Sequence, residues 1–344
     1  KAVARSGAGA VDTQFDITPD KIFQGKLSTE GISLRQILAN EHFGQLATNI
    51  KLSGQLREQN KHDVTVEGTI SQFDYNGYTY QDITVNGSYR QGDISGYFGI
   101  DDPHLAAQLQ GELTEGVFED SSQKAKKVRL VGEVVHFAPA ALHLTDQFGN
   151  AVLSGAIDAD FTARTLNDAK GSLHVTNLIV GETDELPAYH LDNLMLTSGY
   201  DEGIHFLTLK SDFADAELKG RFDYGSLKQS FTNLIASKLP TLPGLPPVRK
   251  TENNFNLRLL VSKTDWLRRF LGVDVQLKHP LSLQAQVNDL SHIINLDGDL
   301  PVFAYNGSWY SDGAIHITSP ADAIKCDLQL TKLLDNGHHL KRNL

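Results

Sequence analysis

Glycine recurs in the apolar phase of a repeated strand pattern, and this feature constrains the fold of the chain more than any other. Side chains alternate between the two faces of a strand, so each run presents one apolar and one polar face. A glycine inside a strand marks a bend, a bulge or the close approach of another group. The pattern predicts an all-β fold, built on a long curved antiparallel sheet with a few short helices. Seven such runs contain a glycine at an apolar position: Gly68, Gly87, Gly96, Gly111, Gly132, Gly155 and Gly298.

Short turn sequences separate these runs and predict hairpins. Asparagine, aspartate and glycine tolerate the left-handed backbone that tight hairpin turns require. Strands joined in this way form a meander of sequential neighbours. The predicted turns contain Asn76-Gly77, Asn86-Gly87, Gln91-Gly92, Gly149-Asn150, Glu202-Gly203, Asn306-Gly307 and Asp312-Gly313.

Three segments have helical patterns. Residues 33–38 have apolar side chains at helical spacing behind a serine cap, and residues 264–272 begin at a threonine and end at a glycine. Residues 226–239 form the strongest helical pattern, which ends at Pro240. The apolar stripe of this helix comprises Leu227, Phe231, Leu234, Ile235 and Leu239.

A proline-rich segment, 240–248, contains four of the eleven prolines and predicts a linker. We therefore expect residues 1–239 to form one β-groove segment, with short helices near 33–39 and 226–239. Residues 249–344 are expected to form a second β-segment of the same groove. A weak repeat of helix, turn and strand at 32–56 and 266–287 favours a structure extended along one axis.

Composition excludes several classes of protein. A net charge of −11 argues against a nucleic-acid partner, and the one basic cluster, 124–129, is interpreted as a solvated loop that leads into a strand. The single cysteine, Cys326, cannot form an internal disulfide, and its place in the apolar phase of a strand predicts burial. No apolar run is long enough to span a membrane.

The sequence contains no persuasive catalytic constellation. It has no nucleophile elbow, no zinc-protease helix motif and no phosphate-binding glycine loop. Residues 101–104, Asp-Asp-Pro-His, are interpreted as a turn after a strand, because a metal site would need more ligands from elsewhere. We therefore expect no enzyme activity, no cofactor and no metal.

The function of the chain depends on whether the apolar face of the sheet is covered or open. A second sheet could cover this face, as in a sandwich, or the sheet could form a trough. Inward glycines favour a trough because a packed core prefers bulk, although glycines that serve only to bend the sheet remain an alternative. Candidate groove-lining and lipid-binding residues are Val64, Val66, Ile70, Ile83, Val85, Ile94, Phe98, Leu109, Leu113, Ile157, Phe161, Leu281, Leu283, Ile294 and Leu296.

Four stretches carry a family resemblance: residues 27–56, 73–111, 222–240 and 266–271. Across them the chain resembles the TamB and AsmA-like proteins (translocation and assembly module) of Gram-negative envelopes, in particular the Bacteroidetes TamB type. The resemblance implies a β-taco, a groove with an apolar interior, in a periplasmic protein whose inner-membrane anchor lies outside this chain. It implies phospholipid or other acyl chains as ligands. The implied protein partner is an insertase-type barrel of the outer membrane, engaged through the full-length protein.

The expected function is a periplasmic segment that bridges the inner and outer membranes and provides an apolar groove for phospholipid transport, outer-membrane protein assembly, or both. One rival is an elongated structural β-scaffold or surface interaction module with a packed core and no lipid track. A second rival, a hydrolase or sugar-binding protein, would need aromatic and carboxylate side chains that converge on one surface. The nearest sequence cluster of that kind is Trp309, Tyr310 and Asp312.

Overall fold

The computed structural model describes residues 2–57, 62–117, 124–238, 247–319 and 323–333. Strands make up 65% of the chain and helices 7%, and every pairing with a defined register is antiparallel. The predicted mostly-β fold with an antiparallel sheet and a few short helices is therefore confirmed. The chain divides into two units, which are described separately. Unit 1 comprises Lys1–Thr162 and Val175–His190, and unit 2 comprises Ala163–His174 and Leu191–Leu344.

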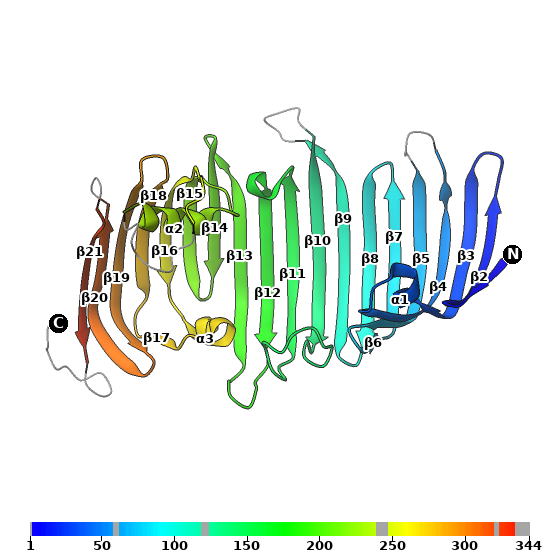
Figure 1. Ribbon diagram of the computed structural model, residues 1–344, viewed down its shortest axis with the longest axis horizontal. Helices are drawn as coiled ribbons and strands as arrows, with labels where there is room; N and C mark the ends of the chain where they lie inside the picture. The colour runs from blue at the N-terminus through cyan, green and yellow to red at the C-terminus, as the bar shows by residue number, and fades with distance from the viewer. Residues whose placement is uncertain (1, 58–61, 118–123, 239–246, 320–322, 334–344) are drawn as a thin grey trace. The chain divides into compact units, whose positions relative to one another are not determined.

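Unit 1 is a meander in which successive strands pair, as can be followed from β2 to β10 in Figure 1. Strand β5 pairs with both the short β6 and the longer β7, and helix α1 (Leu34–Leu38) connects β3 to β4. Its strands are β1 (Ala2–Ser6), β2 (Gly9–Ile17), β3 (Ile22–Ser33), β4 (Phe43–Gln55), β5 (Asp63–Tyr75), β6 (Tyr78–Tyr80), β7 (Ile83–Arg90), β8 (Asp93–Asp102), β9 (Leu105–Val117) and β10 (Lys124–Phe137).

The division between the units falls within three strands and not at the proline-rich segment. These strands are β11 (Leu153–Ala163), β12 (Lys170–Val180) and β13 (Tyr189–Asp201), with the short helix η2 (Leu166–Asp168) between the first two.

Unit 2 continues with pairs of successive strands, β13–β14, β14–β15, β15–β16, β16–β18, β18–β19, β19–β20 and β20–β21, and the short β17 pairs with β19. Its further elements are β14 (Ile204–Ser211), β15 (Ala214–Arg221), α2 (Leu227–Lys238), β16 (Asn254–Val261), α3 (Asp265–Leu271), β17 (Val275–Leu277), β18 (Leu281–Asn288), β19 (Ile293–Tyr305), β20 (Ser308–Thr318) and β21 (Lys325–Lys332).

The proline-rich segment lies inside unit 2. Strand β15 pairs directly with β16, although α2 and this segment separate the two strands in the sequence. Residues 239–246 lie outside the described residues, so the expected end of the helix at Leu239 and Pro240 and most of the predicted linker are not described. The sequence division into 1–239 and 249–344 thus does not coincide with the two units.

Four predicted hairpin turns are confirmed. Both central residues have positive φ at Asn76-Gly77, Gln91-Gly92, Glu202-Gly203 and Asn306-Gly307. The turn predicted at Asn86-Gly87 is wrong, because this pair lies inside β7, where Gly87 faces Gly96 of β8. The turn predicted at Asp312-Gly313 is also wrong. These residues lie within β20, at a shift in the register with β21.

The predicted helix positions at 33–38 and 264–272 are confirmed, but their side-chain caps are not. Ser33 and Thr264 make no capping hydrogen bond, and the Oγ1 of Thr264 instead donates to the Val275 carbonyl at 2.6 Å. Gly272 ends α3 as predicted, with a φ of 66°. In α2, Leu227 of the predicted apolar stripe packs against the core of unit 2. The side chains of Phe231, Leu234 and Ile235, the next residues of that stripe, lie outside the described part.

Each unit has its core where a connecting segment covers one part of the sheet. In unit 1, Leu142 from the loop after β10 is fully buried against the sheet. In unit 2, Leu227 of α2 packs against the buried cluster. The unit 1 cluster contains Tyr80, Ile83, Ile100, Ala107 and Leu142, and the unit 2 cluster contains Leu218, Phe222, Phe255, Val287 and Ile294.

Replacement of Gly68 by alanine is expected to destabilise unit 1. A Cβ atom at Gly68 would lie 2.4 Å from the Asn49 carbonyl oxygen and 2.8 Å from the Ile50 Cα, both on the neighbouring backbone of β4. Backbone cannot move aside cheaply, so Gly68→Ala should lower the free energy of unfolding by about 1–3 kcal/mol. Urea unfolding followed by circular dichroism measures this change.

Gly87 provides the matched control. It lies in the adjacent β7, and a Cβ there would meet nothing closer than the Ser95 carbonyl oxygen at 3.5 Å, an ordinary contact. Gly87→Ala should therefore leave the unfolding midpoint unchanged or raise it slightly. Equal midpoints for the two variants would contradict this interpretation of Gly68.

Candidate apolar binding face

The strand register of unit 1 aligns the apolar phases of β2 to β10 into four rows across the sheet. Directly paired residues of antiparallel strands point to the same side, so each row is a line of neighbouring side chains. The rim row is Ile17, Phe23, Gly54, Val64, Tyr89, Ile94, Leu113 and Val128, and the glycine row is Phe15, Gly25, Leu52, Val66, Gly87, Gly96, Gly111 and Leu130. The middle row is Thr13, Leu27, Ile50, Gly68, Val85, Phe98, Leu109 and Gly132, and the core row is Thr29, Thr48, Ile70, Ile83, Ile100, Ala107 and Val134.

These rows bring together nine of the candidate lining residues, namely Val64, Val66, Ile70, Ile83, Val85, Ile94, Phe98, Leu109 and Leu113. Two others, Ile157 and Phe161, are half-buried on β11. The remaining four, Leu281, Leu283, Ile294 and Leu296, belong to unit 2. The candidates therefore form one set in unit 1 and another in unit 2.

On β8 and β10, exposure rises from the core row to the rim row, whereas Phe23 of the rim row on β3 is only 7% exposed. Ile83 and Ile100 of the core row are each only 5% exposed, beneath the loop that contains Leu142. The candidates in the middle row are half-buried. At the rim row, Ile94 is 48% exposed and Val128 is 42% exposed. The face thus has a closed end and an open end within the same unit.

A buried polar cluster holds the closed end in place. Asp102, which is 1% exposed, accepts hydrogen bonds from the Tyr78 hydroxyl, from the Gln81 amide at 3.1 Å and from the His104 amide at 2.9 Å. Burial raises the pKa of Tyr78 strongly, and its hydrogen bond to Asp102 raises that pKa further. Tyr78 therefore stays a neutral donor. Residues 103–104 form the predicted turn, and the described residues contain no cluster suited to a metal ion.

The glycine row has an uncovered centre. Gly87, Gly96 and Gly111 are direct neighbours on three successive strands. A Cβ at Gly87 would meet nothing closer than 3.5 Å, and one at Gly111 would first meet Leu130 at 3.7 Å, whereas one at Gly96 would lie 2.9 Å from the Asn86 carbonyl oxygen of the neighbouring strand. The result is a shallow strip without side chains, which lies between the middle row and the rim row.

Other glycines of the same face are occupied by their neighbours. The Phe15 ring lies across Gly25, and the Leu109 side chain lies across Gly132, each within 2.3 Å of where a Cβ would be. At Gly54 the neighbouring backbone itself approaches to 2.0 Å. The two sequence interpretations of the glycines, an open trough and local bending, therefore apply at different positions.

Unit 2 has corresponding rows on its own sheet, although they become exposed toward β21. One row is Leu207, Leu218, Leu257, Ala285, Leu296, Ile317 and Cys326, and another is Leu209, Ala216, Leu259, Leu283, Gly298, Ile315 and Leu328. Leu328 is 63% exposed, and Cys326 is exposed, so the predicted burial of Cys326 is wrong. Among the described strands, β21 pairs only with β20, so its apolar side chains lack a neighbour on one side.

A histidine lies within an aromatic stack in unit 2. The His205 ring is stacked between Tyr200 and Phe222, with centroid distances of 4.9 and 4.4 Å. Ser198 donates its Oγ hydrogen to the Ala169 carbonyl at 2.7 Å, so the Nε2–H of His205 donates to that Oγ at 3.0 Å. Burial lowers the pKa of His205, and the charge of Asp168 opposes this effect only in part. Sequence periodicity gave no signal for this site.

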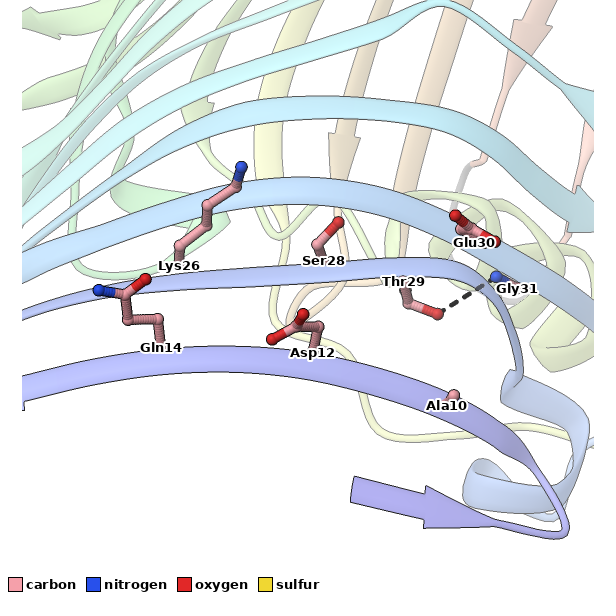
Figure 2. Close-up of a pocket in the computed structure, with 8 residues that line it drawn as sticks. All are labelled: Ala10, Asp12, Gln14, Lys26, Ser28, Thr29, Glu30 and Gly31. Carbon is pink, nitrogen blue, oxygen red and sulfur yellow. Dashed lines mark hydrogen bonds between the residues drawn. The ribbon is translucent and has the colours of Figure 1, made fainter. Parts of the chain in front are cut away.

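The opposite face of the sheet contains a polar hollow over β2 and β3. Asp12 faces Ser28 and Gln14 faces Lys26 in the strand register, in the phase that alternates with the apolar rows. Figure 2 shows these side chains spread along the two strands without converging on one point. Near its end, the Gly31 amide donates to the Thr29 Oγ1 at 3.2 Å. The hollow has mixed charge and offers no built ligand site.

The basic cluster 124–129 was expected in a loop but lies within β10.

The residues near Trp309, which were the nearest sequence candidate for a hydrolase or sugar-binding site, make local packing contacts. Tyr310 stacks on Phe303 at 5.3 Å, and the Lys278 ammonium lies 4.6 Å from the centre of the Trp309 ring. These aromatic residues pack within unit 2 beside the turn at 306–307.

No family model, curated protein or solved structure matches this chain. Within the described ranges, none of the helices has the length and apolar character that crossing a bilayer requires.

The stability of unit 2 is expected to fall in mild acid because of His205. Below a pH of about 6.5 an unfolded chain protonates this histidine, whereas the folded protein resists protonation until the pH reaches its lowered pKa. The free energy of unfolding should therefore decline between pH 7 and pH 5. Denaturant unfolding at several pH values, for the original protein and for His205→Gln, should give a shallower decline in the variant. Identical slopes would contradict this role.

Proposed function

We propose that this chain is a periplasmic segment of a TamB/AsmA-like protein and that its apolar sheet face carries acyl chains of phospholipids between the inner and outer membranes. The observation that carries the proposal is the continuity of the apolar rows from β2 to β10, which have an exposed rim and an uncovered glycine strip. Support of outer-membrane protein assembly through an insertase-type barrel belongs to the same proposal, through the full-length protein.

The physical requirement for such a carrier is a dry apolar surface. Each acyl methylene exposed to water costs about 0.8 kcal/mol, so a chain that crosses water needs nearly continuous apolar cover. In a sheet, the backbone donors and acceptors are paired between strands, so the track presents few polar groups. Side chains on the rim, glycine and middle rows meet this requirement across eight strands of unit 1, β2 to β5 and β7 to β10.

The exposed rim row favours this proposal over the rival scaffold. A scaffold would need its apolar face packed, as the core row is under Leu142. Ile94 and Val128 are instead more than two-fifths exposed, and the centre of the glycine row has no side chain over it. An apolar surface of this kind is typical of a binding site.

A carboxylate on the apolar face should block lipid uptake. In native mass spectrometry with lipid extraction, the purified protein should retain phospholipid, and Phe98→Asp should lose it. Phe98 packs against the unit 1 core, so Val66→Asp, in the glycine row, is the second variant. Binding should fall at least about 10-fold, because a charge cannot be desolvated beside an acyl chain without a large penalty.

Thr65→Asp is the matched control for Val66→Asp. Thr65 is the preceding residue of β5, is exposed and points to the opposite face, so the same charge there should leave lipid binding intact. Circular dichroism establishes that each variant is folded. Undiminished lipid binding by folded Phe98→Asp and Val66→Asp variants would count against the proposal, as would a lipid-free original protein.

A further inference from the structure

An exposed tyrosine lies on the outer face of unit 1, the polar face opposite the apolar rows. Tyr97 of β8 stands between Gly96 of the glycine row and Phe98 of the middle row, so its side chain points to the other side of the sheet. Tyr97 is 38% exposed, and the buried cluster of unit 1 does not include it. This ring is therefore an aromatic surface on a polar face, available to a ligand from solvent.

The Tyr97 ring is held against its own strand. A Cβ atom at Gly99, two residues along β8, would lie 2.6 Å from the Tyr97 hydroxyl oxygen and 3.1 Å from the ring carbons Cε1 and Cζ. The ring therefore rests on Gly99, which fixes its position, and the rest of its surface faces solvent. Among the described residues, Tyr97 stacks on no other ring and its hydroxyl group has no hydrogen-bond partner.

Three carboxamide side chains surround this ring. Asn86 of β7 and Gln110 of β9 directly face Tyr97 in the strand register, and Gln108 faces Gly99. All three are exposed, and within the described part of the chain their side-chain amides have no hydrogen-bond partner. Each amide offers two donor hydrogens and an acceptor oxygen. Neighbouring strands are about 4.8 Å apart, so Asn86, Tyr97 and Gln110 form a line about 10 Å long.

The chemistry of this line fits an uncharged ligand with hydroxyl groups. The carboxamides carry no charge, and the carboxylates of Glu67 and Glu133, which face Asn86 and Gln108 in the register, disfavour an anion. Amides exchange hydrogen bonds with hydroxyl groups, and an aromatic ring packs against C–H bonds. A sugar ring presents both, with hydroxyl groups around its edge and C–H bonds on its faces. The side chains around Tyr97 thus match a neutral carbohydrate.

We propose that the outer face of unit 1 binds an uncharged, extended glycan chain. One sugar ring packs on Tyr97, and its neighbours along the chain exchange hydrogen bonds with Asn86, Gln108 and Gln110. A straight β-1,4-linked chain can touch side chains that lie in a line across three strands, whereas an α-1,4-linked chain curls away from them. This inference is independent of the proposed lipid-carrying function, because the two ligands lie on opposite faces of the sheet.

The test compares two glucose tetrasaccharides that differ only in their linkage. Cellotetraose is β-1,4-linked and maltotetraose is α-1,4-linked, and each is titrated against the protein in saturation-transfer difference NMR, which detects weak ligands. Cellotetraose should bind with a dissociation constant of about 1 mM, as one ring contact and a few exposed hydrogen bonds would provide. Maltotetraose should bind about three- to tenfold more weakly, because it loses at least one of these hydrogen bonds.

Two variants remove the two kinds of contact separately. Tyr97→Leu keeps an apolar side chain over Gly99 but removes the aromatic ring, and Gln110→Ala removes a carboxamide. Each should weaken cellotetraose binding about three- to tenfold. Gln24→Ala is the matched control, because Gln24 is an exposed carboxamide on the same face of β3, separated from β8 by β4, β5 and β7. Its removal should leave binding unchanged.

Several outcomes overturn the inference. They are no binding of cellotetraose up to about 10 mM, equal binding of the two tetrasaccharides, undiminished binding by a folded Tyr97→Leu or Gln110→Ala variant, and an equal loss in Gln24→Ala. Thermal unfolding followed by circular dichroism verifies that the variants are folded. If Tyr97→Leu does not fold, Gln110→Ala decides alone, because Gln110 is exposed and its amide has no partner among the described residues.

Discussion

The antiparallel register of unit 1 is the constraint on which its other features depend. A strand alternates its side chains with a period of two, so a shift of one residue in any pairing would move an apolar set to the opposite face. From β4 to β10 each pairing keeps the same phase within these rows, and apolar residues of successive strands therefore lie on one face of the sheet. Examples are Val64, Val66, Val85, Phe98 and Leu109. The apolar face is therefore a property of the whole sheet and not of any single strand.

The glycines fit this register in three physical ways. At Gly68 the neighbouring backbone comes so close that no side chain can fit, and at Gly25 an aromatic ring from β2 fills the space. At Gly87 and Gly111 a Cβ would make only ordinary contacts, at 3.5 Å or more. A single residue type therefore permits close backbone approach, accepts a neighbouring ring, and leaves a strip uncovered. Which role applies depends on the residue that faces each glycine across the strands.

Much of the local structure could be predicted from sequence, because its causes are local. The apolar phases of the strands, the hairpin at Asn76-Gly77 and the end of α3 at Gly272 follow from side-chain alternation and from positive φ. Asn86-Gly87 has the same local chemistry as a turn, yet it lies in mid-strand because β5 and β8 pair with β7 on both sides. Propensity alone cannot decide between these outcomes.

The candidate site was less predictable, because its geometry depends on contacts between distant parts of the sequence. Nine lining residues could be named from their phase, but phase alone could not show that Gly87, Gly96 and Gly111 would be neighbours. Nor could it show that Leu142 would cover the core row. Cys326 was placed correctly in the apolar phase, and its exposure follows from the position of β21, which pairs only with β20 among the described strands.

The arrangement of charge on β10 follows from the same alternation that builds the apolar face. In sequence, the four cations at positions 124, 126, 127 and 129 form one basic cluster, but a strand sends odd and even positions to opposite sides. Lys127 and Arg129 on the outer face pair with Asp158 and Asp160 of β11, whereas Lys124 and Lys126 on the other face pair with Glu115 of β9. The same alternation places the side chains that Leu142 and Tyr78 contact at the closed end of the face.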